Sequence, residues 1–199
     1  GALPINLEIE ENRTVGPTLG RDALDKGLYA GLFGFILIII FMVSYYRGLG
    51  LISFLNLIIY IIIFWGVIAG IGAALTLPGI AGIILTIGMA VDANVIIFER
   101  IKEEIQKGKS ARLSINQGFR HGLRTIVDAN VTTLITAAAL YRFGTGPIRG
   151  FAVTLSLGVI ISMLTSLVFS RSILYLLAGF KKVANPRFLG VFRKKESNS

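Results

Sequence analysis

The longest uncharged stretch of the sequence is residues 48–91, GLGLISFLNLIIYIIIFWGVIAGIGAALTLPGIAGIILTIGMAV, which runs for 44 residues. A helix needs about 20 predominantly apolar residues to cross a bilayer, so this stretch is long enough for two crossings. Thr76-Leu77-Pro78-Gly79 lies inside it and is typical of a turn. We therefore predict two membrane-spanning helices, at about residues 51–75 and 80–98.

Three further segments have the length and composition of membrane spans. Residues 28–46 are uncharged, and residues 125–141 and 148–170 are apolar with few charges; the last has an interfacial extension to about residue 180. A backbone inside a bilayer must satisfy its own hydrogen bonds, which a helix does. The sequence thus predicts an all-α polytopic membrane protein, with five transmembrane helices in a domain of residues 27–180.

The basic residues indicate an orientation in the membrane. The chain carries 20 Lys and Arg against 11 Asp and Glu, a net charge of +9, although 54% of its residues are hydrophobic. If the N-terminus lies outside, fifteen of the 20 fall on the inner side, mainly at residues 100–124 and from Arg171 onward. Cytoplasmic loops are enriched in Lys and Arg, so we expect a cytoplasmic C-terminus with a basic tail at residues 181–199, and no nucleic-acid partner.

Two segments outside the spans carry their own patterns. Apolar residues alternate with polar ones at residues 5–9, which is typical of a short strand. We expect residues 1–26 to be an extracytoplasmic linker from a larger domain that precedes Gly1.

Residues 110–124 carry an apolar stripe among arginines, which predicts a short amphipathic helix at the cytoplasmic interface. Docking of this helix to a cytoplasmic partner is the alternative.

Two acidic residues, Asp92 and Asp128, lie within the predicted spans. An ionisable side chain at membrane depth is costly and is a functional hypothesis by default. Asp92 has no basic residue within its own span, which favours a role in binding and releasing a proton. Asp128 lies four residues after Arg124, so a structural pair with that arginine is an equal alternative.

The two acids sit in an exact repeat, because VDANV occurs at residues 91–95 and again at residues 127–131. Positions two apart on a helix point about 200° apart, so the Asp and the Asn of each copy face different neighbours. We therefore expect both helices at the centre of the bundle. The candidate proton-relay residues are Asp92, Asp128, Asn94, Asn130 and Thr132; for Asn94, Asn130 and Thr132, interhelical hydrogen bonding is the alternative.

Small residues recur every four positions along two of the predicted spans. One stripe runs from Gly150 to Ser170, and the other comprises Gly66, Gly70 and Ala74. Such stripes let helices approach closely, so we predict close packing rather than a polar permeation path.

Cysteine is absent and there is one histidine, which excludes thiol catalysis and His-rich metal sites. We expect no metal, no cofactor and no enzymatic activity.

Four blocks of the sequence form a recognisable set: PGIAG at residues 78–82, GMAVDANVIIFER at 88–100, DANVTTL at 128–134 and FGTGPIRGFA at 143–152. Together they resemble the SecD branch of the SecD/SecF family of bacterial protein-export membrane proteins. The resemblance implies five of the six helices of one half of a pseudo-symmetric bundle, of the resistance-nodulation-division type, in the bacterial cytoplasmic membrane.

The same resemblance implies a function and partners. Members use the proton motive force to promote export of preproteins, together with SecF and the SecYEG channel. It gives Asp92 the key protonation role, with Asp128, Asn94 and Thr132 in a relay. Two other functions stay open, a proton-coupled small-molecule efflux transporter and a non-transporting scaffold of the export channel. An intramembrane di-aspartyl hydrolase is disfavoured, because the depths estimated for Asp92 and Asp128 differ by about one helical turn.

Overall fold

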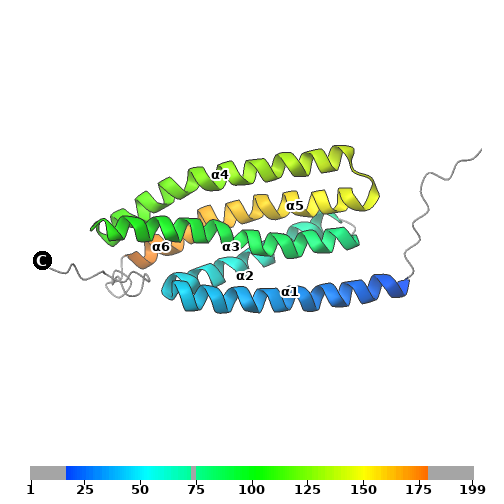
Figure 1. The fold of residues 1–199 in the computed structure, drawn as a ribbon, viewed down its shortest axis with the longest axis horizontal. Coiled ribbons are helices and arrows are strands. Elements are labelled where there is room, and N and C mark those ends of the chain that lie inside the picture. The colour runs from blue at the N-terminus through cyan, green and yellow to red at the C-terminus, as the bar shows by residue number, and fades with distance from the viewer. Residues whose placement is uncertain (1–16, 73–74, 179–199) are drawn as a thin grey trace, which may run out of the picture.

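The computed structural model describes residues 17–72 and 75–178, which form a bundle of antiparallel helices (Figure 1). Five segments are long and apolar enough to cross a membrane. This confirms the predicted all-α, five-helix membrane architecture. The strand expected at residues 5–9 and the basic tail at 181–199 lie outside the described residues. In chain order the elements are α1 (Pro17–Tyr46), α2 (Gly48–Ile71), α3 (Leu77–Gln106), α4 (Ala111–Phe143), α5 (Gly146–Leu164), the π-helical segment η1 (Thr165–Ser170) and α6 (Arg171–Ala178).

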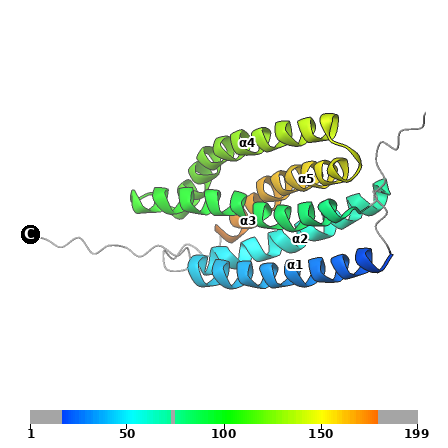
Figure 2. The same cartoon turned by 45° about the vertical axis from the view of Figure 1, so that its right-hand side comes forward.

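The helices α3 and α5 form the interior of the bundle, while α1 and α4 lie at opposite edges (Figures 1 and 2). In the described residues α3 contacts α1, α2, α4, α5 and η1, whereas α4 contacts α3, α5 and α6. The expectation that both helices of the repeated motif lie at the centre is therefore right for α3 and wrong for α4 within this chain. In α4, much of the helix surface faces outward.

The turn inside the long uncharged stretch lies where the sequence predicts it. The first of the two helices ends earlier than expected, at Ile71, because Gly72 takes a left-handed conformation with φ of 61° and its N–H caps the helix. The second begins at Leu77, and the Thr76 hydroxyl caps it by accepting a hydrogen bond from the Gly79 N–H at 3.2 Å. Pro78 in the first turn suits a helix start.

The amphipathic segment expected at residues 110–124 is not a separate helix. It is the beginning of α4, which continues through the span to Phe143. The reason is packing against the end of α3: a Cβ atom on Gly118 would lie 2.5 Å from Cγ1 of Ile101, and one on Gly122 would lie 3.3 Å from Cγ1 of Ile97. The apolar face of this segment is thus covered by α3.

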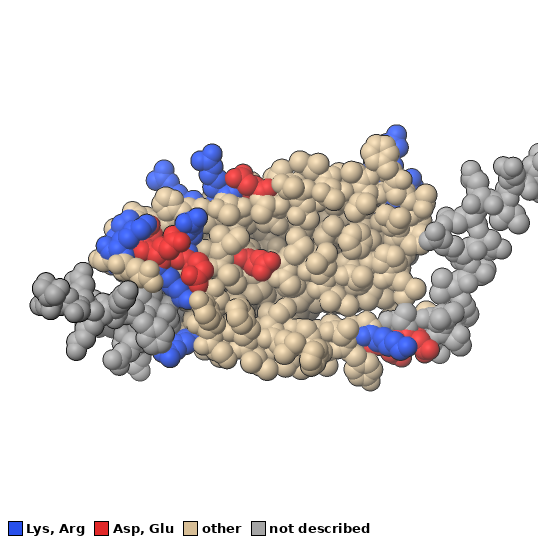
Figure 3. Space-filling model, in the orientation of Figure 1, with Lys and Arg blue, Asp and Glu red and all other residues tan. Residues whose placement is uncertain are grey.

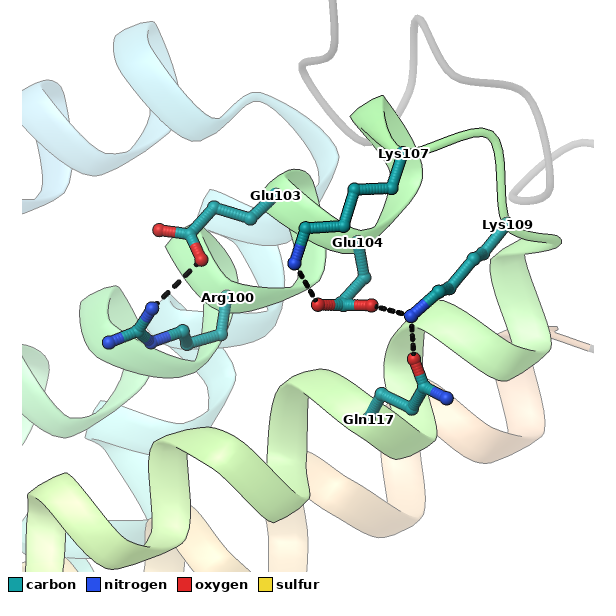
Figure 4. A network of polar contacts seen from close by, with 6 residues as sticks. All are labelled: Arg100, Glu103, Glu104, Lys107, Lys109 and Gln117. Carbon is teal, nitrogen blue, oxygen red and sulfur yellow. Dashed lines mark hydrogen bonds and ion pairs between the residues drawn. The ribbon is translucent and has the colours of Figure 1, made fainter.

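A network of charged side chains joins α3 to α4 at this end of the bundle (Figure 4). Glu104 is buried and accepts hydrogen bonds from Lys107, at 2.6 Å, and from Lys109. Lys109 also donates to Gln117 of α4. A separate pair joins Arg100 to Glu103 at 2.9 Å. Between the charged ends of the molecule, the surface drawn in Figure 3 carries almost no charge.

The contact between α3 and α5 is a reciprocal series of glycines and threonines. Gly82 of α3 lies against Thr154 of α5, and Thr86 of α3 lies against Gly158, where an added Cβ would be 2.5 Å from the Thr86 Cβ. Thr76 lies against Gly150 in the same way. This glycine–threonine seam confirms that the stripe beginning at Gly150 packs closely against a neighbouring helix.

The second predicted stripe does not behave in this way. A Cβ atom on Gly66 or Gly70 would have no described atom within 4 Å, so the prediction of a close neighbour for α2 at these two positions is wrong in the described part of the chain. Ala74, the third residue of this stripe, lies outside the described residues. Instead, α2 makes its closest contact at its other end. Gly50 lies directly against the backbone carbonyl of Met42, which closes a tight α1–α2 hairpin around Arg47, a residue with φ of 51°.

Candidate functional site

Asp92 lies on the outer surface of α3, between two buried neighbours, Val91 and Ala93. Asp128 and Thr132 are likewise exposed on α4. No hydrogen bond or ion pair joins either carboxylate to another residue of the described ranges, and this includes Arg124, the proposed structural partner of Asp128. Two acidic side chains at membrane depth are therefore left without a protein partner on the surface of this helix bundle.

The asparagine of the first motif faces the opposite way. Asn94 is fully buried, and its Oδ1 accepts a hydrogen bond from the Ser170 hydroxyl at 2.7 Å. Its Nδ2 donates to the Ser53 hydroxyl and to the Ala90 carbonyl, each at 3.4 Å. The Asn94 cluster, which we define as Ser53, Asn94 and Ser170, thus joins α2, α3 and η1 inside the bundle.

Further polar side chains continue from this cluster along the interface of α2 with α5 and η1. Asn56 Nδ2 donates to the Ser166 hydroxyl at 3.5 Å. Asn56 Oδ1, the Tyr60 hydroxyl and the Ser162 hydroxyl are buried and make no hydrogen bond to any residue that the structure describes. Buried polar groups are normally paired, so these three atoms indicate places that bound water fills or that gain partners when the packing changes.

The π-helical segment explains how the serines share one buried face. In an α-helix, a step of four residues overshoots a full turn by about 40°, so a stripe with that spacing drifts around the helix. A π turn closes i→i+5 hydrogen bonds and holds more residues per turn, which corrects the drift. As a result, Ser162, Ser166 and Ser170 are all at most 1% exposed. π-Helical turns occur frequently at functional sites.

The second copy of the motif has a different environment from the first. Asn130 is half-buried and its Nδ2 donates to the Ile126 carbonyl of its own helix at 2.8 Å. Thr132 donates to the Asp128 carbonyl at 3.1 Å. Neither side chain makes a hydrogen bond to another described helix. The interhelical role considered for all three is therefore found for Asn94 alone.

The structure separates the five candidate residues into two groups. Asp92, Asp128 and Thr132 lie on the outer surface, while Asn94 is buried and Asn130 is partly covered. No group of three or more His, Cys, Asp or Glu side chains that could hold a metal occurs in the described ranges. The predicted site did not include Ser53, Asn56 and Tyr60, which line one face of α2. Their spacing of three and four residues within an apolar run was the available signal.

Comparison with known proteins gives a consistent result. Residues 2–179 match the family described as "Protein export membrane protein SecD/SecF, C-terminal". The chain is 55% identical over 183 residues to the protein translocase subunit SecD of Desulfurispirillum indicum, an alignment that covers 92% of this chain and 36% of that protein. It is 53% identical over 190 residues to the corresponding subunit of Acidaminococcus fermentans, covering 96% of this chain and 46% of that protein.

A solved structure shares the fold as well as the sequence. The crystal structure of SecDF, a translocon-associated membrane protein from Thermus thermophilus, superposes with a TM-score of 0.81 at 50% identity, covering 83% of this chain and 23% of that one. A second SecDF structure, in a super-membrane-facing form, gives a TM-score of 0.78, covering 89% of this chain and 24% of that one. The chain spans between a third and a half of the length of the two SecD subunits above.

Proposed function

The chain belongs to the C-terminal SecD/SecF family of protein-export membrane proteins, and on this basis we propose that it is the membrane part of an accessory subunit of the Sec protein translocase. In this proposal the subunit uses the proton motive force to promote export of preproteins across the bacterial cytoplasmic membrane, beside the SecYEG channel. Its role is transport and not enzymatic catalysis.

The observation that carries the proposal is the exposure of Asp92 in the middle of an apolar surface. A charged side chain facing lipid is costly, so the face that bears Asp92 and Asp128 has to be covered by a polar surface or by water. We assign this cover to a second half-bundle of the same kind, which in this family is SecF. The two carboxylates then lie at an interface between two bundles, where protons enter and leave.

Protonation of Asp92 removes its charge and with it the preference of this face for a polar neighbour. One elementary charge moving across 100 mV releases about 2.3 kcal/mol, enough to bias two packing arrangements whose free energies differ by a few kcal/mol. Asp92 and Asn94 are two residues apart on α3, on opposite faces. A shift of α3 at the Asp92 face therefore acts directly on the Asn94 cluster and on η1 behind it.

The orientation proposed from the basic residues is compatible with this role. The end of the bundle that holds the α3–α4 loop carries Lys107 and Lys109, and the enrichment of cytoplasmic loops in basic residues supports a cytoplasmic position for this end. The N-terminal end of α1, at the opposite end of the bundle, then faces the outside of the membrane.

Export into inverted membrane vesicles by the full-length subunit, in complex with its partners, tests the proposal. We expect Asp92→Asn to leave assembly intact and to abolish the stimulation that depends on the proton motive force. Glu103→Gln, at the exposed end of the same helix, is the matched control and should export like the wild type. Stimulation of Asp92→Asn at the wild-type level would instead favour a scaffold role, and resistance to drugs on overexpression would favour an efflux transporter.

A further inference from the structure

A cavity of about 380 Å³ lies between α1, α2 and α3, and Tyr60 of α2 is part of its wall. Its size falls within the range of small-molecule sites in proteins, about 300–1,000 Å³. The wall from α1 extends from Leu24 to Phe35, α2 contributes Tyr60 to Trp65, and α3 contributes Ile80 to Ile87. The cavity therefore opens among membrane-spanning segments and not at the charged end of the bundle.

The cavity arises from the way in which α1 meets the bundle. At Gly27, an added Cβ would lie 2.9 Å from Cγ2 of Ile80, and at Gly31 it would lie 3.5 Å from Cγ1 of Ile84. The two glycines bring the α1 backbone close to α3 along one line. The cavity lies beside this contact, where the α1 segment from Leu24 to Phe35 faces Tyr60 to Trp65 of α2.

The walls of the cavity are suited to hydrocarbon. None of the described lining residues carries a charge, and the polar side-chain groups among them are the Tyr60 hydroxyl and the Trp65 indole N–H. Leu28 and Leu32 belong to the wall and are each 57% exposed, so the cavity is continuous with the lipid-facing surface of α1. An apolar space that opens to lipid suits a hydrocarbon chain better than water, because water finds few polar partners there.

The length of the cavity fits one lipid leaflet. The α1 wall spans eleven residue steps, about 16 Å at 1.5 Å per residue, and the hydrocarbon core of a bilayer is about 30 Å thick. We propose that this cavity is a binding site for an acyl chain of a membrane phospholipid from the leaflet next to the N-terminal part of α1. The bound chain supplies the packing that α1 lacks in this half of the membrane.

Trp65 lines the cavity and is the single tryptophan of the chain, so its fluorescence reports on what binds there. The 199-residue chain in detergent is titrated with phosphatidylglycerol brominated on its acyl chains, and quenching of Trp65 fluorescence is followed. We expect saturable quenching that fits one site. Gly31→Leu places a side chain in the cavity and should weaken binding by about tenfold or more, because several apolar contacts are lost.

Gly34→Leu is the matched control. Gly34 is on the same helix, does not line the cavity and has no described atom within 4 Å of an added Cβ, so this variant should bind like the wild type. Ile84→Phe fills the same cavity from α3 and repeats the test if Gly31→Leu displaces α1. Circular dichroism and gel filtration establish that each variant is folded before titration.

Four results would overturn the proposal. Quenching that does not saturate, or that is equal in all folded variants, means general contact of Trp65 with lipid. Quenching that is lost when the protein dimerises, or when a partner helix is added, means that protein and not lipid covers the cavity. None of these results bears on Asp92, so the site can fail while the proposed export function stands.

Discussion

The Ser170 hydroxyl donates a 2.7 Å hydrogen bond to Oδ1 of Asn94, and this bond joins two residues that lie 76 positions apart in the sequence. Both side chains are fully buried. Because Ser170 ends the π-helical segment and Asn94 is two residues from Asp92, the bond connects the helix that carries the candidate proton site to the least regular part of the bundle.

Ser170→Ala should destabilise the protein by about 1–2 kcal/mol, since it leaves the Asn94 carbonyl oxygen buried without its shortest hydrogen bond. Thermal unfolding in detergent measures the effect. Ser172→Ala is the control, because the Ser172 hydroxyl bonds to the Val168 carbonyl of its own helical segment and is exposed; its effect should stay within about 0.5 kcal/mol. Equal effects of the two changes would show that the Asn94 cluster contributes no stability.

Gly158→Ala should destabilise by about 1–3 kcal/mol, because the new methyl group overlaps Thr86 in the glycine–threonine seam. Gly66→Ala should be neutral or stabilising by up to about 1 kcal/mol, since the site is open and Ala is the better helix former. The new methyl group overlaps the Thr86 Cβ itself, which alanine keeps and glycine lacks. Thr86→Gly should therefore restore part of the stability lost in Gly158→Ala, and Thr86→Ala should not. A rescue by both changes would contradict the packing described here.

Gly50→Ala should also destabilise by about 1–3 kcal/mol, because the added methyl group meets the backbone carbonyl of Met42, which cannot move aside as a side chain can. Gly34→Ala on α1 has open space around it and serves as the comparison. Urea or thermal unfolding in detergent reports both values. A Gly50→Ala protein as stable as Gly34→Ala would mean that the α1–α2 hairpin is looser than the structure shows.

Asp128→Asn and Arg124→Gln should each leave the free energy of unfolding unchanged within about 0.5 kcal/mol, since no ion pair joins the two side chains. The measurement is again unfolding in detergent, now as a double-mutant cycle. A coupling free energy above about 1 kcal/mol between the two changes would show that they form the structural pair which the sequence left open.

The sequence was sufficient to predict the spans, because long uncharged runs and the Thr76–Gly79 turn follow directly from the demands of a bilayer. It was not sufficient to predict that α4 is one continuous helix. Residues 110–124 have the pattern of an interfacial helix. Only the contacts of Gly118 and Gly122 with α3 show that this helix packs against protein and not against the membrane surface.

The sequence likewise predicts only part of the candidate site. That Asp92 and Asn94 face different neighbours follows from helical periodicity, and the structure agrees. Which of the two faces is buried does not follow, because both residues are polar and the motif is identical in α4, where the asparagine bonds to its own helix. The drift of the serine stripe was predictable for an α-helix, whereas its correction by η1 depends on a rare hydrogen-bonding pattern.

The α1–α2 hairpin has a mechanical consequence for α1. The helix is clamped at one end, where Gly50 meets Met42, and elsewhere contacts α3 at Gly27 and Gly31 across small residues. Its 30 residues make a rod of about 45 Å. A tilt of α1 about the clamp near Arg47 therefore moves its far end, at Pro17, by more than it moves the clamped end.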